Sequence, residues 1–346
     1  MARRRLLTGD ERRRLFDPPV QETAIIGHYT LSAEDVELVG RRYGPANRLG
    51  LAAQIALMRH PGFGLQPEIG LPDVILQYLA AQLFVDPSSF SAYGQRAQTR
   101  TDHADLVARY LGIRPFRRGD LALALNLAAQ AAEYTDRGEP IVRALMVGLK
   151  GERFILPSGD TLERAGLAGR ARARKAAAAA IVEGLSSAEL TRLDELVINN
   201  PDFGMTPLAW LRNFEEAPTA ANINGLLERL RYVRGIGIHP VVGGAIPEFR
   251  FAQFVREGGV APAFLLSDYS VNRRRATLTA AVRPDLPMPR SKCLTDLSAA
   301  CSRARGVGAS VATKIVFSRW GNSCGCLAPR LQHLMRLSRM AAIRSN

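Results

Sequence analysis

The stretch YTLSAEDVELVGRRYGPANRLGLAAQIALMRHPG, residues 29–62, decides the fold. Ser32 offers an N-cap oxygen just before a run with helical spacing of apolar residues, which predicts a helix over residues 33–42. Gly44 can adopt the left-handed conformation that closes a helix. A second helix, beginning at a proline, is predicted over residues 45–59. The stretch is therefore interpreted as two helices joined by a tight glycine turn.

A helical hairpin of this kind is typical of the helix-turn-helix unit, whose second helix can lie in a DNA major groove. Most of that helix is apolar, and its polar side chains form two narrow stripes. Asn and Gln side chains can pair with adenine, and Arg can pair with guanine or phosphate. The alternative is a hairpin in an all-α protein that never touches DNA. The residues predicted to contact DNA are Asn47, Arg48, Gln54 and Arg59.

The chain has 346 residues, of which 47% are hydrophobic, so it is long enough for two or three domains with cores. Its longest apolar run, residues 121–132, is interrupted by Asn126 and Gln130, so no membrane span is predicted. The basic start is followed by polar residues, which excludes a secretory signal and predicts an intracellular protein.

The formal net charge of +14 is unevenly distributed. Residues 287–346 hold ten of the 46 Lys and Arg and one of the 32 acidic residues, which leaves 36 bases and 31 acids before them. Local basic clusters could still neutralise phosphates, although most such clusters are solvated helix faces. These clusters are Arg3–Arg5 with Arg12–Arg14, Arg41 with Arg42 and Arg48, Arg96 with Arg100, Arg114 with Arg117 and Arg118, and Arg170–Lys175.

Motifs that carry chemistry are missing from the sequence. The four cysteines all follow residue 292 and form no C-x-x-C pair, so zinc is not expected. There is no phosphate-binding P-loop and no G-x-S-x-G, and the five histidines lack metal-ligand spacing. Binding is therefore favoured over catalysis, with no cofactor.

Helical patterns continue along the chain. Thr8 and Glu11 form a predicted capping box, and Thr101 is predicted to cap a later helix. Residues 119–134 are apolar nearly all round, which predicts a buried helix. Ser88 or Ser89 is expected to cap a short helix. Further helices are predicted over 73–84, 141–150, 162–183, 188–197, 224–233, 247–255 and 270–282, with a brief extended piece at 153–156.

Short motifs in a fixed order carry a resemblance to a known family. They are Leu6-Leu7-Thr8, Tyr29-Thr30-Leu31-Ser32, Asn47-Arg48-Leu49-Gly50, Arg59-His60-Pro61-Gly62, Tyr93 with Arg96, Thr99, Arg100 and His103, Leu208-Ala209-Trp210-Leu211-Arg212, Leu227-Glu228-Arg229-Leu230 and Arg273-Arg274-Arg275-Ala276-Thr277-Leu278. In order and spacing, these resemble the N-terminal DNA-binding region of a Tn3-family replicative transposase, over about residues 3–282.

The resemblance implies a mainly α protein with tandem helix-turn-helix-like domains and a helical connector. The boundaries expected are 1–68 and 69–150 for two DNA-binding domains, 151–284 for the connector and 285–346 for an aberrant, disordered tail. It implies binding to the terminal inverted repeats of a transposon during replicative transposition. The family's acidic metal-binding residues lie far downstream, so the chain is expected to be a fragment without enzymatic activity.

The expected DNA-binding residues fall into three groups. The first surface has the four residues named above together with Arg41 and Arg42, and the second has Arg96, Arg100, His103, Arg117 and Arg118. Arg3, Arg4 and Arg5 are a candidate groove-following arm. The expected partner is double-stranded DNA, and a second copy or the full-length transposase is the candidate protein partner. The expected location is the bacterial cytoplasm, on the nucleoid and off the membrane.

After Val282 the resemblance stops. The segment TKIVFSRWGNSCGC, residues 313–326, can be back-translated and read one nucleotide out of phase as an amphipathic helix. The hypothesis is a frameshift near residue 285 that truncates the transposase. The nucleotide sequence of the gene tests it, since a shifted frame without a transposase continuation would refute it.

Two alternatives from other classes stay open. One is a catalytic chain with a metal site among Asp102, Asp105, Asp120 and Glu133, which magnesium-dependent strand cleavage would support. The other is a helical protein-interaction scaffold without specific DNA binding, in which the helices of residues 141–200 assemble subunits. Oligomerisation that is independent of salt, without DNA binding, would favour it.

Overall fold

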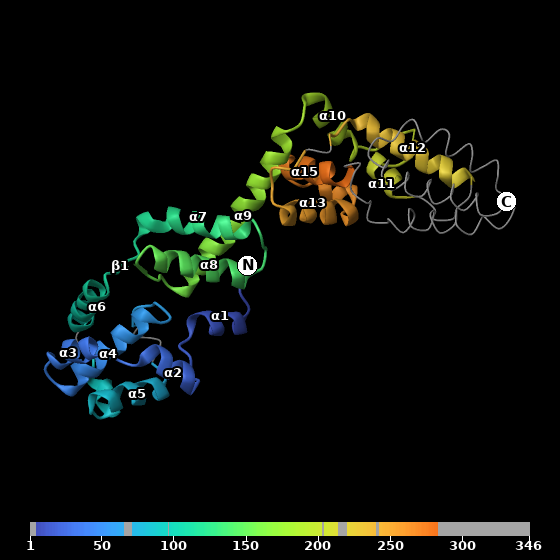
Figure 1. Ribbon diagram of the computed structural model, residues 1–346. Coiled ribbons are helices and arrows are strands. Elements are labelled where there is room, and N and C mark those ends of the chain that lie inside the picture. Colours follow the sequence, from blue (N-terminus) through green and yellow to red (C-terminus); the bar gives the residue numbers. More distant parts are fainter. Residues whose placement is uncertain are drawn as a thin grey trace, which may run out of the picture. The chain divides into compact units, whose positions relative to one another are not determined.

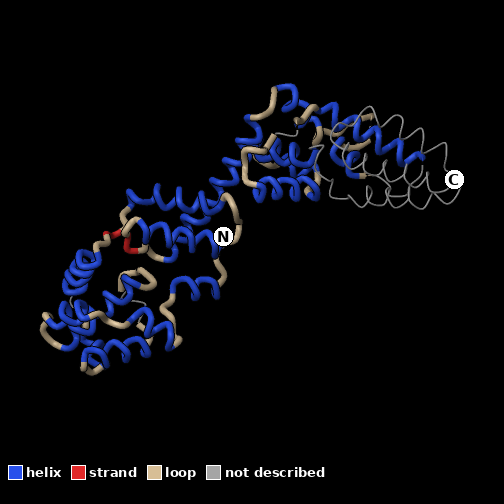
Figure 2. Tube along the Cα trace, in the orientation of Figure 1, coloured by secondary structure: helices blue, strands red, loops and turns tan. Residues whose placement is uncertain are grey.

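The computed structural model describes residues 5–65, 71–95, 97–202, 204–213, 220–239 and 242–282 (Figure 2). The predicted mainly α fold is confirmed, since the described part is built of helices with two short strands (Figure 1). The chain divides into two compact units, residues 1–176 and 177–346. The predicted tail, residues 285–346, lies outside the described residues.

The predicted hairpin is confirmed as α3 (Ala33–Gly40) and α4 (Pro45–Arg59). The Ser32 hydroxyl accepts a hydrogen bond from the Asp35 backbone N–H at 3.2 Å, and the Asp35 carboxylate accepts one from the Ser32 N–H at 2.8 Å. This reciprocal capping box fixes the start of α3. Gly44 has a φ of 82°, which a side chain would disfavour, and it serves as the N-cap of α4.

Helix α4 is the centre of the first helical group. Every residue from Leu49 to Met58 is buried, because other helices pack around the whole circumference of α4. A helix enclosed in this way cannot lay its middle in a DNA groove, so of the predicted DNA contacts on α4 only those near its two ends stay open to solvent. The surrounding elements are α2 (Glu22–Tyr29), α3, α5 (Asp73–Leu83), the 3-10 helix η1 (Pro87–Ala92) and α6 (Ala97–Leu111).

Two helix starts differ from the prediction. Helix α6 begins at Ala97, and Thr101 lies inside it with its hydroxyl donating to the Ala97 carbonyl at 3.2 Å. Threonine can satisfy its hydroxyl on the preceding turn, so its presence does not require a cap. The cap of η1 is Asp86, whose carboxylate accepts from the Ser88 N–H at 2.8 Å.

A second helical group completes the first unit. It consists of α1 (Gly9–Phe16), α7 (Leu121–Ala132), α8 (Gly138–Gly151) and the first part of α9 (Gly159–Glu183), which share one hydrophobic cluster. The Thr8 and Glu11 capping box of α1 is confirmed. The N-terminal segment and α1 thus pack on helices more than 100 residues away in sequence. The predicted boundaries at 68 and 150 stay predictions, and this cluster joins residues 6–16 to residues 116–173.

Short strands link the two groups of the first unit. The parallel strands β1 (Arg114–Pro115) and β2 (Phe154–Ile155) confirm the predicted extended piece. The next residue, Leu156, donates its N–H to the Gly62 carbonyl at 2.9 Å, just after α4. The 3-10 helix η2 (Arg118–Asp120) leads from β1 into α7.

Helix α7 is not buried all round, so that prediction is wrong. Only Ala124, Ala128 and Ala132 are fully covered, and Leu121 is 43% exposed. Alanines at every fourth position form a flat stripe that lets a neighbouring helix approach closely, and the leucines beside the stripe lie partly at the surface.

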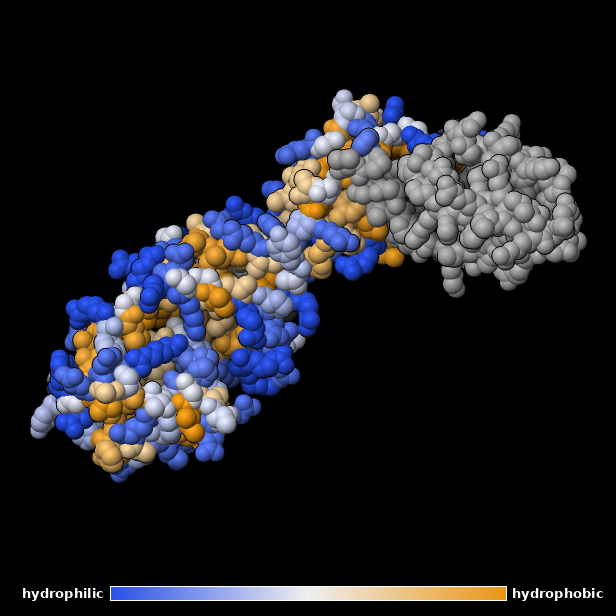
Figure 3. Space-filling view, viewed as in Figure 1, coloured by the Kyte–Doolittle hydropathy of each residue, from blue (hydrophilic) through white to orange (hydrophobic). Residues whose placement is uncertain are grey.

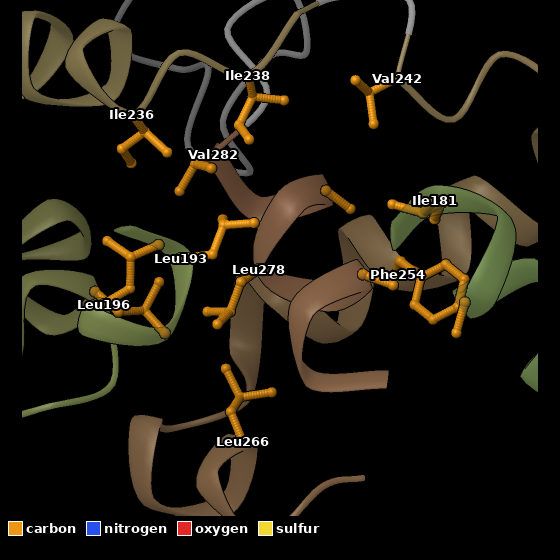
Figure 4. Close-up of a cluster of buried hydrophobic side chains, with 14 of the residues drawn as sticks. Ile181, Leu193, Leu196, Ile236, Ile238, Val242, Phe254, Leu266, Leu278 and Val282 are labelled. Carbon is orange, nitrogen blue, oxygen red and sulfur yellow. The ribbon is translucent and has the colours of Figure 1, made fainter. Parts of the chain in front are cut away.

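The second unit has its own core, to which the end of α9 contributes Ile181 (Figure 4). Leu278 on α15 lies near the middle of this cluster, and Phe254 on α13 lies on the side of Ile181 (Figure 4). A Cβ on Gly258 would lie 2.7 Å from the Thr277 carbonyl oxygen, so glycine permits the close packing of α13 on α15. The helices are α10 (Ser187–Glu195), α11 (Pro207–Arg212), α12 (Ala220–Ile236), α13 (Glu248–Val260), α14 (Ala263–Ser267) and α15 (Val271–Val282).

Candidate nucleic-acid interface

The turn between α3 and α4 carries a compact basic surface. The sequence has no acidic residue from Leu38 to Pro67. Arg41 and Arg48 are exposed, and the Tyr43 side chain between them is 94% exposed. A cationic turn with a free aromatic ring is suited to phosphate contacts and to stacking.

Hydrogen bonds hold this turn in shape. The Arg48 guanidinium Nε donates to the Arg42 carbonyl at 3.0 Å, and the Asn47 amide donates to the Tyr43 carbonyl at 3.0 Å. Within the described part of the chain, Arg41 is paired with Glu37 at 2.6 Å, whereas neither Arg42 nor Arg48 has a carboxylate partner. Two arginines in this turn therefore keep positive charge that none of the described acidic side chains neutralises.

The start of α4 adds a further positive contribution. This helix has 15 residues, no acidic residue in its first turn and no side-chain hydrogen bond at its Gly44 cap. Its first backbone N–H groups therefore remain available, and the helix dipole places partial positive charge beside Arg48. Anions are favoured at such a helix end.

The structure places Gln54 away from this surface. Its side chain is 2% exposed, and its amide N–H groups donate to the Tyr93 hydroxyl and to the Arg100 carbonyl, both at 3.0 Å. Its position one turn beyond Gly50 on a helix packed on every side explains the burial. In this position Gln54 ties α4 to α6 and does not meet a base edge.

The second predicted group is divided between the interior and the surface. His103 is 7% exposed, and its Nδ1 lies 3.0 Å from the Tyr93 hydroxyl. Burial, with a further contribution from the charge of Arg42, lowers the pKa of His103 below its ordinary value. Arg100 is half-buried, and a Cβ on Gly94 would lie 2.4 Å from its Cγ. His103 is thus a buried residue that is hydrogen-bonded to Tyr93 and is not open to DNA.

Arg59 is engaged in a buried ion pair. Its guanidinium forms two hydrogen bonds with the carboxylate of Asp35, one of them at 2.6 Å, and Asp35 is fully buried. The Tyr110 hydroxyl donates to the same carboxylate at 2.8 Å. Burial opposes ionisation of Asp35, but the hydrogen bonds from Arg59, Ser32 and Tyr110 outweigh it and hold its pKa below the ordinary value. The Asp35 carboxylate therefore joins α3 to α4 through Arg59 and to α6 through Tyr110.

Three of the remaining predicted residues are exposed: Arg5, Arg117 and Arg118. The last two lie between β1 and α7 and have no acidic partner among the described side chains, although the Arg117 backbone N–H donates to Asp120 at 2.8 Å. Arg3, Arg4 and Arg96 lie outside the described residues. The structure thus brings together Arg41, Arg42, Asn47 and Arg48.

The acidic residues of the catalytic alternative do not form a metal-binding group. Asp102 accepts from the Gln98 amide at 2.7 Å, and Asp120 caps its own 3-10 turn. No group of three or more His, Cys, Asp or Glu that could hold a metal is found in the described ranges. None of the described helices is both long and apolar enough to span a bilayer.

Sequence reasoning missed two features of this region. Tyr43 is one, and the acid-free run with the adjacent Arg41 and Arg42 could have pointed to it. The other is the buried network of Gln54, Tyr93 and His103, which joins residues 39 and 10 positions apart in the chain. Local spacing contains no sign of such contacts. Hydrophilic side chains, with apolar ones between them, cover much of the visible face of the first unit (Figure 3).

Comparison with known proteins shows similarity to transposases over most of the chain. Residues 6–168 match the family described as "Domain of unknown function (DUF4158)". The chain is 33% identical over 282 residues to the transposase for transposon Tn501 of Pseudomonas aeruginosa, and 33% identical over 281 residues to that for Tn21 of Escherichia coli. It is 27% identical over 278 residues to the transposase for Tn1546 of Enterococcus faecium.

These alignments cover 80–82% of the chain and 28% of each of the three relatives. The chain therefore spans little more than a quarter of the length of the transposases that it matches. Each alignment is longer than either unit, so it includes residues of both units. These comparisons support the expected resemblance to the N-terminal region of Tn3-family transposases, with a match to the DUF4158 family at residues 6–168.

Proposed function

We propose that this chain binds duplex DNA at the terminal inverted repeats of a transposon, in the manner expected of a transposase N-terminal region. The observation that carries the proposal is the turn between α3 and α4. There Arg42 and Arg48 lack acidic partners among the described side chains, and Tyr43 is fully accessible, in a chain related to transposases.

The proposed contact is made by the turn and the first turn of α4 rather than by the body of that helix. Arg48 and Asn47 stand at the α4 N-terminus, which is the part of a recognition helix that meets base edges in helix-turn-helix proteins. Arg41 and Arg42 would then lie along the phosphate backbone. Arg5, Arg100, Arg117 and Arg118 are proposed as further backbone contacts of the same unit.

Fluorescence anisotropy with two duplexes of equal length and composition tests the proposal. One carries the inverted repeat that flanks the gene's own transposon, and the other carries a scrambled sequence. We expect the full chain to prefer the inverted repeat by at least about 10³-fold at physiological salt. Equal affinity for both duplexes would refute specific recognition.

Arg48→Ala tests the residue assignment. Loss of one base or phosphate contact should weaken binding by about 5- to 100-fold and lower the log–log salt slope by about 0.9 if a phosphate is lost. Arg13→Ala is the matched control, because Arg13 is an exposed helical arginine paired with its neighbour Asp10. Unchanged binding by Arg48→Ala would remove the turn from the interface.

We further propose that the chain binds transposon ends without cutting them, since it spans 28% of the relatives' length. Incubation with supercoiled DNA that carries two ends, with magnesium or manganese, should yield no nicked product. Strand cleavage by the isolated chain would overturn this part of the proposal and favour the catalytic alternative.

The scaffold alternative has one supporting observation in the second unit. Val260 is 80% exposed and Phe264 is 74% exposed, close together in sequence at the end of α13 and in α14. Exposed apolar side chains of this size are typical of surfaces that bind another protein. Sedimentation at several salt concentrations would favour the scaffold if the chain oligomerised without binding either duplex.

A further inference from the structure

A second cluster of basic side chains lies where the two helical groups of the first unit meet. His28 is in the last turn of α2, His60 caps the end of α4, and Lys150 is in the last turn of α8. The two imidazole rings stack face to face, with centroids 3.7 Å apart and planes 2° apart. The Lys150 side chain packs against Gly62, two residues after His60. A Cβ added at Gly62 would lie 2.5 Å from the Lys150 Cε.

Hydrogen bonds and backbone conformation hold His60 in place. The Tyr29 hydroxyl donates to the His60 carbonyl at 3.2 Å. Gly62 has a φ of 113° and accepts the Leu156 N–H at 2.9 Å, which connects this turn to the strand that follows α8. The position of the cluster is therefore set by contacts from α2, α4 and the α8–β2 connection together.

Among the residues that the structure describes, no acidic side chain pairs with this group of nitrogens. Across the described ranges, His28, His60 and Lys150 form no ion pair, whereas Arg12, Arg59 and Arg174 are each paired with a carboxylate. Burial, followed by the nearby charges of His28 and Lys150, lowers the pKa of His60 to about 4. Burial also lowers the pKa of Lys150. The site thus has surplus positive potential that a bound anion would relieve.

The chemistry of the side chains favours a phosphate over a metal ion. Neutral imidazole N–H groups and an ammonium group are donors to phosphate oxygens, and charge-assisted hydrogen bonds of this kind are strong. Imidazole lone pairs lie in the ring plane, so two rings that are stacked in parallel do not aim their lone pairs at one ion between them. His28 is exposed, which leaves the cluster open to a ligand.

We infer that His28, His60 and Lys150 form a phosphate site that takes one backbone phosphate of the bound duplex. This inference rests on the proposed DNA binding and adds a contact outside the α3–α4 turn. A phosphate beside His60 favours its protonated form, so binding takes up a proton. The affinity for DNA should therefore rise as the pH falls from 7.5 to 5.5.

The test uses the full chain and anisotropy with the inverted-repeat duplex at pH 5.5, 6.5 and 7.5. Lys150→Met removes the charge and keeps most of the unbranched side chain. Lys175→Met, on the exposed part of α9, is the matched control. We expect Lys150→Met to weaken binding by about 5- to 10-fold and to lower the salt slope by about 0.9. His60→Asn, which removes the imidazole that takes up the proton, should flatten the pH dependence. Urea unfolding of each variant verifies the fold.

The outcomes separate this inference from the proposed function. If Arg48→Ala weakens binding but Lys150→Met and His60→Asn match the wild type at all three pH values, DNA binding stands and the phosphate site falls. If the wild type binds neither duplex, both fall together. A titration with inorganic phosphate is the third measurement, in which the NMR signals of the histidine ring C–H groups report binding. Shifts with free phosphate, together with unchanged DNA affinity of Lys150→Met, would overturn the assignment to the DNA backbone.

Discussion

Asp35 places a charge inside the first helical group. Asp35→Asn removes the negative charge and leaves the Arg59 guanidinium, 34% exposed, facing a neutral group. Breaking a buried pair in this way should destabilise the first unit by about 2 to 3 kcal/mol, the lower part of the usual range because Arg59 is partly solvated. Urea unfolding at pH 7, followed by circular dichroism, measures the change.

Glu37→Gln is the control for Asp35→Asn, since Glu37 lies on the same helix and pairs with exposed Arg41. Its effect should be under about 0.5 kcal/mol. The folded-state pKa of Asp35 lies below 3.8, so its contribution to stability is present above pH 3.8 and is lost as the pH falls through the folded-state value. Equal effects of the two variants would contradict the assignment of Asp35 as a structural charge.

Gly50 is required where α4 meets the ring of Tyr93. A Cβ there would lie 2.1 Å from Cδ2 of a ring that Gln54 and His103 hold in place. Gly50→Ala should therefore cost about 1 to 3 kcal/mol through overpacking. Gly27→Ala, in helix α2 with no atom within 4 Å of the new Cβ, should instead stabilise by about 0.5 to 1 kcal/mol. Thermal unfolding compares the two, and stabilisation by both would show that Tyr93 moves freely.

His60 makes stability depend on pH with a defined sign. Its pKa is about 4 in the folded chain and 6.5 when unfolded, so the unfolded state binds more protons between these values. Stability should therefore fall as the pH drops from 6.5 to 4, by about 1 to 2 kcal/mol after allowance for solvent screening. His60→Asn should abolish this loss of unfolding free energy between pH 6.5 and 4. His239→Asn, in the other unit, should leave the loss unchanged. If stability fell equally with pH in the wild type and in His60→Asn, His60 would not be the source of the pH dependence.

Helices α4 and α7 show why the burial of a helix cannot be predicted from its own sequence alone. Both are apolar on most of their circumference, yet α4 is enclosed and α7 is covered along one alanine stripe. The difference lies in the number of neighbours, because α4 is surrounded by five elements whereas the main partner of α7 is α8. A sequence window contains the apolar residues but not the helices that pack on them.

Helices α10 and α15 depend on one carboxylate. Asp194 accepts hydrogen bonds from Arg274 at 3.0 Å and from Arg275 at 2.7 Å. Burial opposes its ionisation, but the bonds from Arg275 and Arg274 outweigh burial and lower its pKa. Asp194→Asn should destabilise the second unit by about 2 kcal/mol. Glu257→Gln, which affects the more exposed pair with Arg273, should cost under about 1 kcal/mol in the same urea titration.

In the whole molecule, the two compact units have separate cores. Effects of Asp35→Asn and Asp194→Asn should therefore add within about 0.5 kcal/mol in the double variant. In a Trp320→Phe background, Trp210 fluorescence reports on the second unit. Asp194→Asn should shift its unfolding midpoint and Asp35→Asn should not. A single transition that both variants shift equally would show that the units unfold as one.

The candidate site was partly predictable. The order of basic residues in Gly40–Arg48 is enough to place a cationic turn, and it lies where the sequence indicates. Gln54 and Arg59 could not be assigned from spacing, because their roles depend on Tyr93 and Asp35, which the fold brings next to them. Polar side chains on an apolar helix satisfy buried hydrogen bonds as readily as they face solvent, and only their neighbours decide which.

By itself, the sequence determined the helical class, the capping boxes at Thr8 and Ser32, the glycine turn and the similarity to transposases, because each depends on residues a few positions apart or on their order in the chain. Tertiary structure alone decided that α4 is a core helix, that α1 packs on α8 and α9, and that His28, His60 and Lys150 meet. The physical reason is distance along the chain. Burial and charge neighbourhoods are set by partners far away in sequence, and those partners meet only once the chain has folded.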